Sequence, residues 1–144
     1  MGFKIALGGD HGGYKAKTFV IEMLTKQDHI LHDFGTNNEE SVDYPDFVHP
    51  LATAVENEEF DFGILFCGSA NGVCMSANKH QKIRAAIAWT AEIAALAKQH
   101  NNANVLCIPG RFLNESELEE IINSYINATF EGGRHQRRVD KIPC

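Results

Sequence analysis

The chain has 144 residues, of which 44% are hydrophobic, and a formal net charge of −6. This length and composition suit one ordinary domain that builds its core without disulfides or structural metal, and the acidic balance argues against a nucleic-acid partner. The sequence has neither a run of about 18 apolar residues nor a secretory signal, so we expect a soluble cytoplasmic protein with no membrane partner. Its four cysteines are scattered along the chain, so we expect them to be reduced thiols.

Short apolar runs alternate with helical patterns along the chain. In chain order, these patterns predict a strand at residues 4–7, a helix at 14–27, a strand at 30–34, a helix from Pro45, a strand at 61–66, a short helix at 73–78, a strand at 84–89, a helix at 91–99, a strand at 105–108 and an amphipathic helix after 114. The segment Asp43-Tyr44-Pro45 is typical of a capped helix start, and Pro50 should kink or shorten that helix. Asn114 and Glu117 have the spacing of a capping box.

Strands that alternate with helices predict a parallel sheet covered on both faces, because each parallel connection needs a crossover. We therefore predict a single α/β domain over residues 1–144, a Rossmann-like three-layer sandwich with a five-stranded parallel sheet. Ligands of such sheets bind beyond the carboxyl ends of the strands. The segments that follow the first, third and fifth predicted strands are Gly9-Asp10-His11-Gly12-Gly13, residues 67–72 and Gly110-Arg111.

Cys67 stands at the start of a turn that joins a predicted strand to a predicted helix. Gly68 and Gly72 allow the backbone to turn sharply and to point amide groups outward, and the helix adds the positive end of its dipole. Such surroundings stabilise anions and lower the pKa of a cysteine from about 8.5 toward neutrality, where a base or a nucleophile works best. We therefore expect Cys67 to be the reactive group of the chain.

Seven segments of the chain, in this order, resemble the family of type B ribose-5-phosphate isomerases and galactose-6-phosphate isomerase subunits. They are Gly9-Asp10-His11-Gly12-Gly13, Asp43-Tyr44-Pro45, residues 67–72, Ser76-Ala77-Asn78-Lys79, Ile83-Arg84-Ala85, Gln99-His100-Asn101 with Asn104-Val105-Leu106, and Glu131-Gly132-Gly133-Arg134-His135-Gln136. The sequence departs from the family at Ala70, where glycine is usual, and at Ile108-Pro109.

The resemblance implies an aldose-ketose isomerase in which Cys67 moves a proton between neighbouring sugar carbons. The hydroxyl of Ser69 and the amide groups of Gly68 and Gly72 would stabilise the enediolate, with Asn71 or Asn101 as further donors. The family pattern places His100 close to Asp10 for opening the sugar ring. Tyr44 would line the sugar pocket.

The phosphate group of such a substrate needs strong cationic donors. Arg134 and Arg138 are four residues apart, so a helical tail would put both on one face, and His11 and Arg111 would complete the anion site. In the family, a C-terminal arm, here residues 131–144, reaches the active site of a neighbouring subunit. The resemblance therefore implies a homodimer with shared active sites, leaves a tetramer open, and implies no metal or organic cofactor.

Ribose 5-phosphate and ribulose 5-phosphate are the substrate pair that we expect, with galactose 6-phosphate or allose 6-phosphate as the alternative. A cysteine phosphatase would need an arginine six residues after Cys67, where this chain has Val73, so we reject that class. A flavodoxin-like binding module remains a distant alternative, and it would show no turnover that depends on Cys67.

Overall fold

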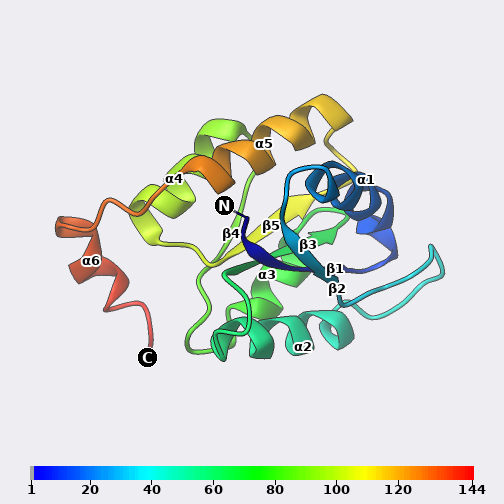
Figure 1. Ribbon diagram of the computed structural model, residues 1–144. Helices are drawn as coiled ribbons and strands as arrows, with labels where there is room; N and C mark the ends of the chain where they lie inside the picture. Colours follow the sequence, from blue (N-terminus) through cyan, green and yellow to red (C-terminus); the bar gives the residue numbers. More distant parts are fainter. Residues whose placement is uncertain (1) are drawn as a thin grey trace.

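The computed structural model describes residues 2–144 and forms a five-stranded parallel sheet (Figure 1). Its strands are β1 (Lys4–Gly9), β2 (Ile30–Asp33), β3 (Phe62–Cys67), β4 (Ala85–Ile87) and β5 (Val105–Pro109), in the spatial order β2-β1-β3-β5-β4. Every neighbouring pair runs parallel, so all five carboxyl ends lie at one edge of the sheet. The predicted α/β class and parallel sheet are confirmed.

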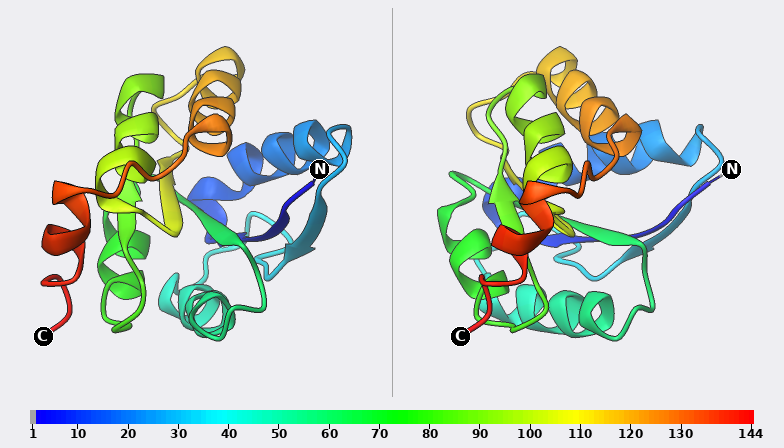
Figure 2. Two further views of the ribbon diagram at one scale, coloured as in Figure 1. Left: turned by 60° about the vertical axis from the view of Figure 1, so that its left-hand side comes forward. Right: turned by 90° about the vertical axis from the view of Figure 1, so that its left-hand side faces the viewer.

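Helices cover both faces of the sheet (Figure 2). They are α1 (Tyr14–Thr25), α2 (Pro45–Glu56), α3 (Asn71–Ala77), α4 (Ala91–Asn101), α5 (Glu115–Asn127) and α6 (Arg134–Val139), with a short 3-10 helix, η1 (His11–Gly13), before α1. Helices α1, α4 and α5 pack on one face, and α2 and α3 pack on the other. This arrangement gives the three layers that the alternating pattern predicts.

The central strand β3 shows how the sequence positions the reactive thiol. Phe62, Ile64 and Phe66 point into the core beneath α1, α4 and α5, whereas Leu65 and Cys67 point into the core beneath α2 and α3. Both faces of β3 are buried, which explains why its sequence is continuously apolar rather than alternating. The sulfur therefore lies on the face of the sheet that α2 and α3 cover.

Two local predictions differ from the structure. Pro50 neither ends nor shortens α2, which continues to Glu56. Proline removes the hydrogen bond to the carbonyl of Asp46, but both residues are exposed, so water can bind that carbonyl. Pro45 is the first residue of α2, as the segment Asp43-Tyr44-Pro45 predicts, but the cap residue is Tyr44, whose side chain makes no capping hydrogen bond. The capping box of Asn114 and Glu117 is confirmed at the start of α5.

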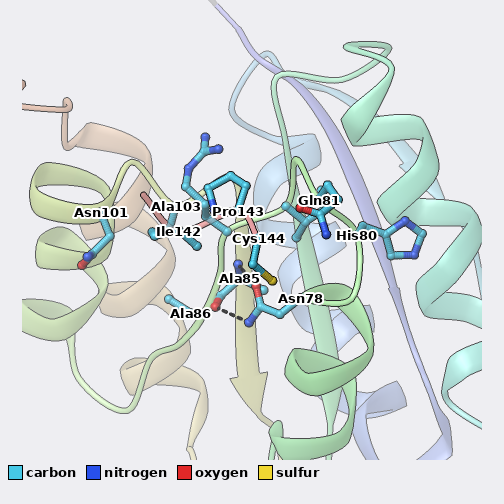
Figure 3. A pocket seen from close by; sticks show the side chains of 12 residues that line it. Asn78, His80, Gln81, Ala85, Ala86, Asn101, Ala103, Ile142, Pro143 and Cys144 are labelled. Carbon is cyan, nitrogen blue, oxygen red and sulfur yellow. Dashed lines mark hydrogen bonds between the residues drawn. The ribbon is translucent and has the colours of Figure 1, made fainter. Parts of the chain in front are cut away.

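The chain after α5 packs against the end of α4. The amide of Glu131 donates to the carbonyl of Gln99 at 3.0 Å, and α6 contacts α4. Beyond α6, residues Ile142, Pro143 and Cys144 lie near the start of β4, where they border a cavity of about 310 Å³ that Asn101 also lines (Figure 3). The last segment is thus held by its own chain beside α4 and β4.

Two further findings concern the whole of residues 2–144. None of the helices in this range has the length and apolar character needed to cross a membrane. All four cysteines are free thiols, as their scattered positions predict.

Candidate active site

Three segments meet at the carboxyl edge of the sheet. Gly9 is in register with Phe66, and Cys67 is in register with Pro109. The segments that leave these strands therefore lie side by side. Their contacts confirm this, since the amide of Asp10 donates to the carbonyl of Phe66 at 3.2 Å and the amide of Arg111 donates to the carbonyl of Gly68 at 3.2 Å.

Asp10, Arg111 and two glycines form the centre of this edge. The Asp10 carboxylate is nearly buried and accepts a hydrogen bond of 2.9 Å from the amide of Gly12. A Cβ atom at Gly12 would lie 3.0 Å from the amide nitrogen of Gly68 and 3.3 Å from Nη2 of Arg111. A Cβ atom at Gly68 would lie 3.1 Å from Nη1 of the same arginine. The glycines therefore let a guanidinium approach the backbone of the Cys67 turn.

Cys67 is almost covered, with 5% of its surface exposed. Its sulfur accepts a hydrogen bond of 3.0 Å from the amide of Ala70. Burial raises the pKa of the Cys67 thiol and the negative charge of Asp10 raises it further, while the amides of Val73, Ala70 and Ser69 lower it without compensating fully. The prediction that the turn lowers this pKa is therefore wrong for the isolated chain, because desolvation outweighs the amide groups.

The turn after Cys67 contains a left-handed residue that is not glycine. Ala70 has φ 68° and ψ −6°, and it caps the start of α3. This conformation costs an alanine about 1–2 kcal/mol, which the rest of the fold must supply. The amide of Asn71 donates to the Ser69 hydroxyl at 3.4 Å and helps to hold the turn. Ala70 therefore adopts the backbone conformation that the family's usual glycine would favour.

His11 and Tyr44 flank the turn as predicted binding residues. Nδ1 of His11 accepts a hydrogen bond of 3.2 Å from the amide of Val42, so we assign the proton of a neutral His11 ring to Nε2, which can donate to an anion. The Tyr44 ring packs on Gly72 so closely that a Cβ atom there would overlap it. Both side chains therefore belong to the same edge of the sheet as Cys67.

The other predicted site residues lie in a different part of the fold. Helix α4 starts after the carboxyl end of β4 and runs back to the opposite edge of the sheet, so His100 and Asn101, at its end, lie at the amino edge. Arg134 and Arg138 are exposed on α6, beside the same end of α4. The arrowheads of β3 and β5 point away from α6 (Figure 1). Within one chain, His100 is therefore not close to Asp10, contrary to the expectation.

His100 has two neighbours that the sequence did not identify as site residues. Its ring stacks on that of His135, with centroids 4.3 Å apart and planes at 10°. Oε1 of Glu131 lies 3.6 Å from Nε2 of His100 and 3.5 Å from Nε2 of His135. Burial and the neighbouring His100 lower the pKa of His135. Glu131 precedes α6 and is not helical, so its spacing of four residues from His135 gave no helical signal for this pairing in the sequence.

Comparisons with known proteins place the whole chain in one group. Residues 5–142 match the sequence model of the family described as Ribose/Galactose Isomerase. The chain is 47% identical to the probable ribose-5-phosphate isomerase B of Mycoplasma genitalium, over 99% of this chain and 95% of that protein.

Two solved structures are similar over nearly their full length. The ribose 5-phosphate isomerase of Thermotoga maritima has a TM-score of 0.96 and 40% identity, covering 98% of this chain and 97% of that one. The Mycoplasma genitalium ribose-5-phosphate isomerase B with bound ribulose-5-phosphate has a TM-score of 0.92 and 44% identity, covering 99% and 95%. Together with the matched motifs, these similarities show that the chain belongs to the ribose/galactose isomerase family.

Proposed function

We propose that this protein interconverts ribose 5-phosphate and ribulose 5-phosphate by proton transfer through an enediolate. The observation that carries the proposal is the placement of the Cys67 sulfur in a turn beside Asp10, with the Arg111 guanidinium over Gly68. The relative from Mycoplasma genitalium, which is 44% identical in its solved structure, binds ribulose-5-phosphate. A base next to anion-binding donors is the combination that aldose-ketose isomerisation requires.

The turn supplies the groups for the proton-transfer step. The Cys67 thiolate removes the proton from the carbon next to the carbonyl and returns it to the neighbouring carbon. The enediolate oxygen then carries negative charge, which the amides of residues 68–72 and the Ser69 hydroxyl stabilise, with Asn71 nearby. Burial raises the pKa of Cys67 in the isolated chain, so further cationic groups near the sulfur would favour the thiolate that this step uses.

We further propose that these cationic groups come from a second copy of the chain. Asp10, His11, Tyr44 and the Cys67 turn lie at one edge of the sheet, whereas His100, Asn101, Arg134 and Arg138 lie near the other. Neither set alone can open the sugar ring, transfer the proton and hold the phosphate. A homodimer that brings the α4 and α6 residues of one chain to the Cys67 turn of the other makes two complete sites.

An exposed apolar surface supports this assembly. Met75, Trp89, Ile93 and Phe112 are between 46% and 67% exposed, and all four lie on or next to elements that adjoin the edge strand β4 or its neighbour β5. The Trp89 and Phe112 rings contact each other, with centroids 5.5 Å apart. Because the exposed Trp89 and Phe112 rings form one apolar contact, we propose that the surface around them belongs to the dimer contact.

A direct assay tests the activity and the substrate. We expect the purified protein to isomerise ribose 5-phosphate and to exchange the C2 hydrogen with solvent deuterium, without added metal or cofactor. Its kcat/KM for ribose 5-phosphate should exceed that for allose 6-phosphate and galactose 6-phosphate. A higher value with a six-carbon substrate would replace the substrate assignment, and the absence of turnover with all three would refute the isomerase proposal.

The tail arginines provide a separate test of the phosphate site. Arg134→Ala and Arg138→Ala should each raise KM by about 10- to 100-fold with a smaller effect on kcat, because each removes a charge-assisted bond worth about 1.5–3 kcal/mol. Arg137→Ala is the matched control, since it removes the same charge from the same helix at a residue with no proposed contact to the phosphate. If all three changes raise KM equally, KM depends only on the total charge of α6, and the proposed phosphate contacts of Arg134 and Arg138 are wrong.

A further inference from the structure

Three potential metal ligands meet where the C-terminal segment packs on α4. They are His100, Glu131 and His135, whose ligand atoms all lie within 4.8 Å of one another. His135 is anchored by burial, with 10% of its side chain exposed, whereas 39% of the His100 side chain and 52% of the Glu131 side chain are exposed. The cluster is therefore built on a fixed residue and is open to solvent on one side.

Two of the three distances between ligand atoms are close to those between neighbouring ligands of a small ion. Ligands bound at about 2.0–2.1 Å around a tetrahedral ion lie about 3.3–3.4 Å from one another. The Glu131 oxygen lies 3.6 Å from Nε2 of His100 and 3.5 Å from Nε2 of His135. The two rings are now nearly parallel, so binding requires them to tilt until both nitrogens face the same point.

The chemistry of the cluster selects the class of ion. Two imidazoles and one carboxylate suit Zn²⁺ and neighbouring transition metals, while Mg²⁺ and Ca²⁺ prefer sites made of oxygen ligands. Three protein ligands leave a fourth position for water. Arg134 and Arg138 stand close enough to His135 to influence its charge, and their positive charges oppose a cation. The site should therefore bind reversibly rather than permanently.

We propose that His100, Glu131 and His135 form a binding site for a divalent transition-metal ion of the zinc class, and that the bound ion inhibits the isomerase. The inhibition rests on the proposed function, because it follows from the role of His100 in ring opening. An ion that occupies Nε2 of His100 takes away the lone pair or proton that ring opening needs. The ion is thus an inhibitor and not a cofactor of the reaction.

Binding is measured first without any assay of activity. Chelator-treated protein is titrated with Zn²⁺ by calorimetry and with Co²⁺ by absorption spectroscopy. The cobalt spectrum distinguishes histidine and carboxylate ligands from cysteine thiolates. We expect one ion per chain, bound without a thiolate-to-cobalt band. Glu131→Gln and His135→Gln should weaken binding at least about tenfold, since even indirect changes around metal sites cost 10- to 100-fold. His49→Gln, in a separate histidine pair on the surface, is the matched control and should bind as the unaltered protein does.

Inhibition is measured next on the same proteins. Micromolar Zn²⁺ should lower the isomerase rate of the unaltered protein and of His49→Gln, a chelator should restore it, and Glu131→Gln and His135→Gln should need at least tenfold more Zn²⁺ for the same loss. Zinc binding that these two changes leave intact would overturn the site. Occupancy of the site without loss of rate would overturn the inhibition. If the zinc-free protein has no isomerase activity, the proposed function fails, and calorimetry still decides the metal site.

Discussion

Replacing Cys67 by alanine should lower kcat by about 10²- to 10⁴-fold, the range that a positioned general base contributes. The same change should stop the exchange of the C2 hydrogen of the substrate with solvent deuterium. Binding of the sugar phosphate should change little, because the residues proposed to hold the phosphate are unaltered. Steady-state kinetics and the appearance of deuterium in the product measure the two effects.

Two controls separate loss of the base from loss of the fold. Cys67 is buried, so urea denaturation and circular dichroism must show that the variant remains folded. Cys144→Ala removes the exposed thiol at the end of the chain and should retain full activity. Deuterium exchange at an undiminished rate in folded Cys67→Ala protein would remove Cys67 from the role of the base.

Mixing two inactive variants should restore activity if the sites are shared between chains. Cys67→Ala damages one edge of the sheet and His100→Ala damages the other, so each homodimer has two defective sites. In a mixed dimer, one site receives both defects and the other receives none. Random exchange should therefore restore about a quarter of the unaltered activity, because half of the dimers carry one intact site of two.

The matched control for this experiment pairs Cys67→Ala with Asp10→Ala. Both residues lie at the same edge of one chain, so every site of a mixed dimer keeps one defect, and no activity should return. Recovery in the control, or none with His100→Ala, would contradict the proposed sharing. Sedimentation of the unaltered protein should also give a dimer or a multiple of it.

Much of the fold could be predicted because the local sequence patterns agree with how the whole chain packs. The continuous apolar run of β3 reflects burial on both faces, and the capping box of Asn114 and Glu117 fixes the start of α5 within the local sequence. The carboxyl edge of a parallel sheet then brings Asp10, the Cys67 turn and Arg111 together without further information. These residues could be predicted as one group from strand order alone.

The remaining features depend on contacts between distant segments. The pKa of Cys67 is set by how deeply α2 and α3 cover the thiol and by Asp10 from another loop, and no feature of the turn itself reports this burial. The pairing of His100 with His135 depends on the path of residues 128–133 back to α4. A local pattern specifies a turn or a helix, but not the path of a tail across the surface.

The covered position of Cys67 also bears on how the protein withstands oxidative stress. Oxidants attack thiolates that solvent can reach, and the first product, a sulfenic acid, can proceed to irreversible forms. In the isolated chain this sulfur is 5% exposed and accepts a hydrogen bond from the Ala70 amide, and burial raises the pKa of its thiol. We therefore expect peroxide to oxidise this thiol slowly in the isolated chain, and faster where the proposed second copy and a bound sugar phosphate bring cationic groups to it.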